Sequence, residues 1–172
     1  MKKLGINTFL LLSLFFLIIG CSNKDDTTFF SERNFEDKSK ILEVINGYNE
    51  GINSEDLHKI MLSFPKDFKM PDDKDNSIVH SYSTIENDFK NFFERSSVIS
   101  YKFDDIFLTV NEKNCRANFK VSRKFNGHAP FNYSVNDEEY ETIYLEKRND
   151  NNWYFTTISH RLLPPAIEDL DQ

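Results

Sequence analysis

The chain contains 172 residues with a formal net charge of -7, and its aromatic residues are 17 Phe, 7 Tyr and 1 Trp. This length suits a single domain, and the aromatic side chains can fill a core of that size. The acidic balance argues against nucleic acid as a partner, because nucleic acids are bound mainly through neutralised phosphates. It also disfavours binding of the protein's own side chains to an anionic lipid surface.

The first twenty residues have the pattern of an export signal. Lys2 and Lys3 precede an apolar run over residues 9–19, and Gly20 and Cys21 follow it. The apolar run is shorter than the roughly 20 residues that a transmembrane helix needs. The pattern therefore favours a cleaved signal peptide over residues 1–20.

The tetrapeptide Ile18-Ile19-Gly20-Cys21 resembles the lipobox of bacterial lipoproteins. The resemblance implies cleavage between Gly20 and Cys21 and attachment of diacylglycerol and an acyl chain such as palmitate to Cys21. The mature chain would then contact the membrane through this lipid, because several acyl chains anchor a protein where one does not. Cleavage would also remove two lysines and no acid, which changes the net charge from -7 to -9. The alternative is an ordinary signal peptide with a chance cysteine.

Residues 21–36 read as a polar tether that continues into a helix. Ser22 occupies the position at which the outer-membrane sorting rule forbids aspartate, and Lys24-Asp25-Asp26 resembles a lysine–diacid tag for surface display. These resemblances imply a lipoprotein of the bacterial cell envelope, placed in the outer membrane and exposed at the surface if the tag is read. The alternative is a solvated linker without an address.

Three amphipathic helices are predicted in the first half of the domain. The first ends at Gly51, the second follows Ser54 as its N-cap, and the third begins at a capping box of Ser83 and Glu86. Between the last two, residues 66–80 read as an exposed loop with a short strand near its end. The predicted buried stripes are Ile41, Val44, Ile45, Tyr48 and Ile52; Leu57, Ile60, Met61 and Phe64; and Ile85, Phe89, Phe92 and Phe93.

Antiparallel strands are predicted from Val98 onward, where the apolar period changes to two. Tyr101 and Phe103 share one face with Ile99, but the next apolar set is out of phase by one residue. An extra residue at Asp104-Asp105 would restore the phase, which predicts a bent strand with a β-bulge there. The returning strands are expected over residues 115–125, 139–147 and 153–160, with a hairpin extension near 131–135. Because Cys21 is expected to carry lipid, Cys115 would be a free, buried residue of the second strand.

Helices followed by an antiparallel meander place the domain in the α+β class. The helix pair, the third helix, the bent strand and the closing Asn-Asn-Trp-Tyr-Phe strand resemble the nuclear-transport-factor-like cone fold, shared with relatives of ketosteroid isomerase and scytalone dehydratase. The resemblance spans the expected domain, residues 37–162, and leaves an acidic tail over 163–172. One departure is the turn Asp150-Asn151-Asn152, which lacks the glycine that is common there.

The resemblance implies an interior that holds an apolar ligand or a catalytic acid. The pocket candidates are Tyr48, Tyr101, Phe103 and Tyr144. In an enzyme, Asp105 would be the base and a tyrosine or His160 the donor, because a carboxylate in an apolar pocket has a raised pKa. The alternatives are that Asp105 is a solvated bulge residue and that the aromatic residues are only core.

Neither a metal nor a cofactor is expected. The histidines at 58, 80, 128 and 160 are scattered, and the acidic run over 72–75 lacks the glycine and the final acid of a calcium loop. No nucleophile elbow or glycine-rich phosphate loop occurs in the sequence.

Three functions remain. The first is a membrane-anchored, non-enzymatic domain that binds an apolar small molecule or a protein partner. The second is an isomerase, dehydratase or hydrolase with a carboxylate in the pocket. The third is a homodimeric or toxin-neutralising protein that uses the outer sheet face.

Overall fold

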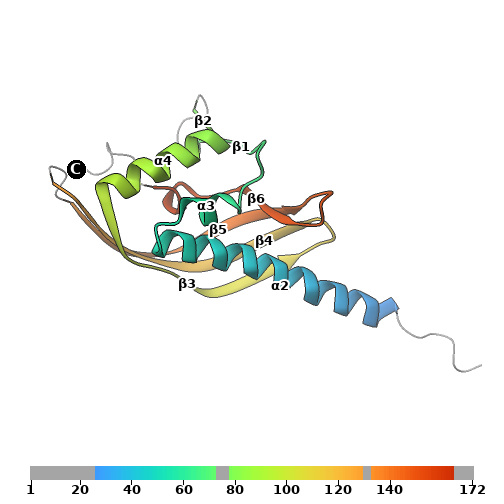
Figure 1. Ribbon diagram of the computed structural model, residues 1–172. Helices are drawn as coiled ribbons and strands as arrows, with labels where there is room; N and C mark the ends of the chain where they lie inside the picture. Colours follow the sequence, from blue (N-terminus) through green and yellow to red (C-terminus); the bar gives the residue numbers. More distant parts are fainter. Residues whose placement is uncertain (1–25, 73–77, 130–132, 165–172) are drawn as a thin grey trace, which may run out of the picture. The chain divides into compact units, whose positions relative to one another are not determined.

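The computed structural model describes residues 26–72, 78–129 and 133–164 (Figure 1). The chain consists of two compact units, residues 1–35 and residues 36–172. Of the first unit, only the start of helix α2 (Asp26–Asn53) is described. The predicted signal peptide, Cys21 and most of the acidic tail lie outside the described residues. Within these residues, no helix has the length and apolar character needed to cross a bilayer.

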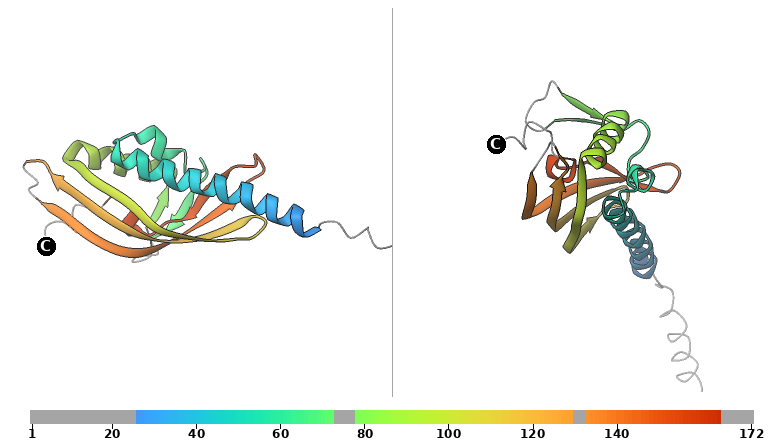
Figure 2. Two further views of the ribbon diagram at one scale, coloured as in Figure 1. Left: turned by 90° about the horizontal axis from the view of Figure 1, so that it is seen from below. Right: turned by 60° about the vertical axis from the view of Figure 1, so that its left-hand side comes forward.

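The second unit is an α+β domain, as the sequence predicts. Its helices lie on the concave face of a curved antiparallel sheet with the order β3-β4-β5-β6 (Figure 2). The strands are β3 (Ser96–Val110), β4 (Asn114–Gly127), β5 (Ser134–Lys147) and β6 (Trp153–Thr157). Strand β6 pairs with only the last four residues of β5, and the chain then forms a short 3-10 helix, η1 (His160–Leu162), where a longer strand was predicted.

A small hairpin replaces much of the predicted loop before the third helix. Strand β1 (Lys69–Pro71) pairs with β2 (Val79–Ser81). The sequence predicted a short strand at the start of β2 but not β1. Its side chains give little periodic signal, because only Met70 of β1 is buried. Residues 73–77 lie outside the described part of the chain.

Helices α3 (Leu57–Met61) and α4 (Tyr82–Arg95) begin at different caps from those predicted. Asp56 caps α3, accepting from the Lys59 backbone N–H at 3.1 Å. Ser54 instead donates its hydroxyl to the Glu50 carbonyl at 2.7 Å, which closes α2. The capping box of α4 consists of Ser81 and Thr84, two residues before the expected pair, because the chain leaves β2 at Ser81.

The bend in β3 comes from two bulges. The register with β4 shifts between Asp104 and Phe107, and Asp105 has a positive φ of 53°, which confirms the predicted bulge. Another shift, between Val98 and Ser100, was not predicted; in chain order it is the first bulge, and the one at Asp105 is the second. The first bulge places Ile99 outside, 50% exposed, although the sequence pattern had grouped this residue with Tyr101 and Phe103.

The end of α2 is joined to β3 at the first bulge. The Asn53 side chain donates to the Tyr101 carbonyl at 2.6 Å and accepts from the Tyr101 N–H at 2.8 Å. Glu55 accepts from the Val98 N–H at 3.1 Å. The Asn53 amide thus takes the place of a neighbouring strand's peptide group, which satisfies the edge of β3 and fixes the position of Tyr101.

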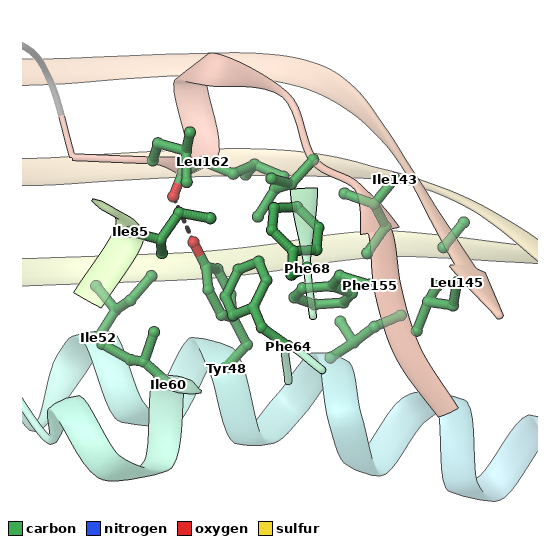
Figure 3. Packing of buried hydrophobic residues seen from close by; sticks show 14 of the residues in the cluster. Tyr48, Ile52, Ile60, Phe64, Phe68, Ile85, Ile143, Leu145, Phe155 and Leu162 are labelled. Carbon is green, nitrogen blue, oxygen red and sulfur yellow. Dashed lines mark hydrogen bonds between the residues drawn. The ribbon is translucent and has the colours of Figure 1, made fainter. Parts of the chain in front are cut away.

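Aromatic rings fill the interior between helices and sheet (Figure 3). Tyr48 is fully buried at the centre, where it contacts Phe64, Phe89 and Phe155 edge-on and stacks with Phe103 at a centroid distance of 6.3 Å. The core is therefore close-packed, and a substitution that changes its volume will be felt.

Cys115 is a free, buried cysteine of β4 within the described residues, as predicted, and burial raises the pKa of its thiol to about 11.

A buried carboxylate anchors α2 to the turn between β5 and β6. Asp37 accepts from the Lys147 ammonium at 2.7 Å and from the Trp153 indole N–H at 3.2 Å. In the turn itself, Asn151 adopts a positive φ of 65°. Asparagine tolerates this conformation, so the hairpin forms without the glycine that the related fold commonly has.

Two glycines of α2 offer a matched test of the packing between α2 and α3. A Cβ at Gly51 would lie 2.8 Å from Ile60 Cγ1 and 2.9 Å from the Ile60 backbone nitrogen, whereas a Cβ at Gly47 meets nothing within 4 Å. We expect Gly51→Ala to lower the free energy of unfolding by about 1–3 kcal/mol. Gly47→Ala should raise it by up to about 1 kcal/mol, because alanine favours a helix. Urea unfolding of both variants measures this, and equal effects would contradict the close approach.

Candidate functional site

Charged residues occupy the concave face of the sheet where β4 meets the first half of β5. Residues 121 and 125 of β4 are buried, so Arg123 between them shares their inward face. The same alternation carries Asp137, Glu139 and Glu141 of β5 toward this side, in phase with the buried Ile143. This face therefore changes from aromatic to polar along the sheet.

Arg123 forms the centre of this polar region. Its Nε donates to Asp137 at 2.8 Å, and its Nη2 donates to the other oxygen of the same carboxylate. This two-point hydrogen bond from Arg123 holds the pKa of Asp137 below its usual range. Arg161 of η1 pairs with Glu139 and, at 3.7 Å, with Glu141. Both arginines are thus neutralised by acids of β5.

The hydroxyl of Tyr101 lies in this region without a partner. Tyr101 is paired with Arg123 across β3 and β4 and is only 4% exposed. Among the described residues, its Oη is the buried side-chain atom for which no hydrogen bond is found. Burial raises the pKa of Tyr101, and the nearby Arg123 charge opposes this shift only in part. The phenol is therefore a protonated, unused donor at neutral pH.

Residues 158–164, called the closing segment here, cover this region. Ile158 and Leu162 are each 2% exposed and Leu163 is 7% exposed. The Tyr48 hydroxyl donates to the Leu162 carbonyl at 2.5 Å (Figure 3), and Arg123 Nη1 donates to the Arg161 carbonyl. The segment is thus held by side chains from α2 and β4.

Little space remains beneath the closing segment. The cavity lies between Phe89 and Phe92 of α4, Tyr101, Arg123 and Leu163. It has room for about one water molecule, far less than a small-molecule site requires. In this conformation, the closing segment fills the space between α4 and the sheet almost completely.

The structure brings together three of the four predicted pocket residues. Tyr48, Tyr101 and Phe103 pack against one another, with centroids of Tyr101 and Phe103 5.4 Å apart. Tyr144 instead lies on the outer face and is 45% exposed, because it is out of phase with the buried residues on either side of it in β5.

The predicted base does not share this interior. Asp105 is exposed at the second bulge, where it is the extra residue and interacts with Lys120. This is a correction to the expectation that Asp105 faces the pocket. His160 lies in η1, but its side chain is outside the described part of the structure.

Sequence reasoning missed Arg123, Asp137, Glu139, Glu141 and Arg161. Arg123 had a readable signal, since it occupies an inward position in the alternation of β4 between two apolar residues. Asp137 was missed because β5 begins at Ser134, five residues before the predicted start. Glu139 and Glu141 lay inside the predicted strand, but their pairing with Arg161 is a tertiary contact that leaves no local pattern. Within the described ranges, no group of three His, Cys, Asp or Glu side chains is placed to hold a metal ion.

A second hollow runs along the outside of α2, past α3 and the start of β6. It is wide and open to solvent, and its lining includes Lys40, Glu50, Lys59, Leu62 and Tyr154. Lys59 and Glu50 pair with each other across it. No buried unpartnered group of the described residues faces this groove, so it carries no comparable indication of a ligand.

Comparison with known proteins identifies the fold. No family model matches the chain, and no curated protein matches it. Among solved structures, a conserved protein from Planctomyces limnophilus has a TM-score of 0.58 at 10% identity and covers 71% of this chain and 92% of its own. A ketosteroid isomerase-like protein from Erwinia carotovora atroseptica has a TM-score of 0.55 at 11% identity, with 69% and 89% covered.

A nuclear-transport-factor-like protein from Cytophaga hutchinsonii has a TM-score of 0.53 at 9% identity and covers 69% of this chain and 92% of its own. Identities this low establish a shared fold and nothing about activity. The predicted resemblance is thereby confirmed for the fold: the chain has the nuclear-transport-factor-like architecture.

Two tyrosines give a matched test of the site. Tyr48→Phe removes the hydrogen bond to the Leu162 carbonyl and should lower the free energy of unfolding by about 1–2 kcal/mol. Tyr101→Phe removes a hydroxyl that has no partner among the described residues, so it should leave stability unchanged or raise it by about 1 kcal/mol. Thermal and urea unfolding distinguish the two. A loss in Tyr101→Phe as large as that in Tyr48→Phe would show that the Tyr101 hydroxyl is bonded after all.

Proposed function

We propose that the chain is a bacterial lipoprotein, anchored through lipid on Cys21, whose domain binds an apolar small molecule without converting it. The lipobox-like Ile18-Ile19-Gly20-Cys21 supports the anchor. The buried Tyr101 hydroxyl beside Arg123 carries the binding proposal, since an unused donor in an apolar interior is suited to fix the orientation of a ligand. Ser22 supports a location in the outer membrane, and the tag Lys24-Asp25-Asp26 supports display at the cell surface.

The arrangement favours binding over catalysis. Asp105 is exposed at the second bulge and lies outside the interior in which a ligand would be held, so it is not placed to act as a base on that ligand. Asp137 faces the site, but Arg123 holds its pKa low and occupies both of its oxygens. A weakly basic and fully bonded carboxylate is poorly suited to abstract a proton. We therefore rank an isomerase, dehydratase or hydrolase activity second.

An exposed aromatic surface favours self-association as an additional role. The outer face of the sheet presents Phe107, 67% exposed, Tyr140, 66% exposed, and Tyr144. Polar residues lie between these aromatic side chains, among them Lys120 and Thr142. Exposed aromatics on a long regular sheet are a common basis for protein contacts. A homodimer through this face is compatible with ligand binding on the opposite one.

Replacement of the expected lipid acceptor tests the anchor. In the lipoprotein account, Cys21→Ser abolishes incorporation of labelled palmitate and releases the protein from the membrane fraction, because no acyl chain remains. Cys115→Ser is the matched control, since Cys115 is buried in β4, and should leave labelling intact. Labelling that persists in Cys21→Ser would contradict the anchor.

Native mass spectrometry tests the binding role. Residues 21–172 with Cys21→Ser, incubated with a lipid extract of the source cells, should retain an additional small-molecule mass. Tyr101→Phe should retain much less, while Asp105→Asn, an exposed bulge change, should retain as much as the parent. A bare mass of one chain in every sample would contradict small-molecule binding. A mass of two chains would support the dimer.

A further inference from the structure

We propose that the closing segment, residues 158–164, is a displaceable plug that holds the place of an uncharged, apolar ligand with at least two acceptor oxygens. This inference rests on the binding function proposed above. It adds which part of the chain must move and what chemistry replaces it.

The plug fills the site as a ligand would. Leu162 and Leu163 insert their side chains into the apolar end of the interior, next to Ile52, Phe89 and Phe92. Their backbone brings polar atoms to the other end, and the Leu162 carbonyl meets the Tyr48 hydroxyl (Figure 3). An apolar body with a polar end directed at fixed donors is the usual composition of a bound small molecule.

Three donors would face the site once the plug leaves. Tyr48 Oη and Arg123 Nη1 now donate to the carbonyls of Leu162 and Arg161, and Tyr101 Oη has no partner among the described residues. Buried donors that lose their acceptors are costly, so the open state requires a molecule that supplies acceptor oxygens. The two peptide carbonyls of the plug show that uncharged oxygens satisfy these donors.

The charges around the site exclude an anion. Arg123 is already neutralised by Asp137. Arg161 belongs to the plug, so its departure takes a positive charge away from Glu139 and Glu141. The open site would then carry an excess of carboxylates beside the ligand. A carboxylate or sulfonate on the ligand would be repelled, whereas carbonyl, ester or amide oxygens would be accepted.

The plug is built to separate from the domain without unfolding it. It follows the last residue of β6 and makes no ladder pairing, since β6 ends at Thr157. Its regular structure is a single 3-10 turn closed by the Leu162 N–H to the Ser159 carbonyl at 2.9 Å. At its start, the Ile158 N–H is directed at the Met70 sulfur, a weak acceptor. A segment without ladder pairing can open without breaking the hydrogen bonds of the sheet, at the cost of exposing Ile158, Leu162 and Leu163.

Dye binding tests the proposal. The parent is residues 21–172 with Cys21→Ser, and the plug variant adds Leu162→Ser and Leu163→Ser. The control adds Leu62→Ser, a residue that is 62% exposed and lines the groove outside α2. The uncharged dye Nile red, which has a ring carbonyl, should bind the plug variant about tenfold more tightly than the parent or control, because more of the population is open. Anilinonaphthalene sulfonate, an anion, should show no gain.

Further variants separate the outcomes. Tyr101→Phe in the plug variant should reverse much of the Nile red gain. If the plug variant does not keep a native near-ultraviolet circular dichroism spectrum, Arg161→Gln takes its place in the experiment. This change removes only the ion pairs to Glu139 and Glu141, and we expect it to raise the affinity for Nile red about threefold. Unchanged Nile red affinity in a folded variant overturns the plug, and an equal gain for both dyes overturns the uncharged ligand.

One result would separate the proposed binding function from the plug. A parent that retains a cellular ligand while plug variants bind it no better would leave that function standing and refute only the plug.

Discussion

The bend of β3 is the constraint on which the rest of the domain depends. Two bulges, at Val98–Ser100 and at Asp104–Phe107, turn this strand so that Tyr101 and Phe103 both face the helices. Asn53 fixes the first bend from the end of α2 by pairing with both peptide groups of Tyr101. Because the sheet curves around α2 at this point, Tyr48 can contact rings from α4, β3 and β6 at once. The same bend aligns Tyr101 with Arg123 of β4.

That curvature encloses more volume than the helices alone fill, and the chain completes the packing with its own closing segment. The aromatic end of the interior is close-packed, whereas the other end is a network of two arginines and three acids. A polar network in this position is stable only while its members are satisfied. The unpartnered Tyr101 hydroxyl is the exception among the described residues, and it lies where the last turn of the chain meets the sheet. The packing and the proposed binding function thus both involve residues 158–164.

Much of the fold follows from sequence periodicity, but the site does not. The apolar stripes of α2 and α4, the bulge at Asp104-Asp105 and the burial of Cys115 were all predictable, because each leaves a local pattern. The first bulge was not, since Ile99 fits the apolar alternation although it lies outside. Asp105 was expected inside because it continues the alternation of Tyr101 and Phe103, yet the bulge leaves it unpaired and exposed. Arg123 and Asp137 are 14 residues apart in the sequence, and only the pairing of their strands brings them into contact. The helix η1 likewise depends on a tertiary contact with Tyr48.

Amide hydrogen exchange tests most directly whether the closing segment separates from an otherwise intact domain. The N–H of Leu162, bonded to the Ser159 carbonyl, should exchange well before the N–H groups of the β4–β5 ladder, such as those of Phe119 and Ile143, with little dependence on denaturant. Loss of protection at Leu162 only together with the ladder, and with the denaturant dependence of global unfolding, would show that the segment is part of the core. The account of a displaceable plug would then be wrong.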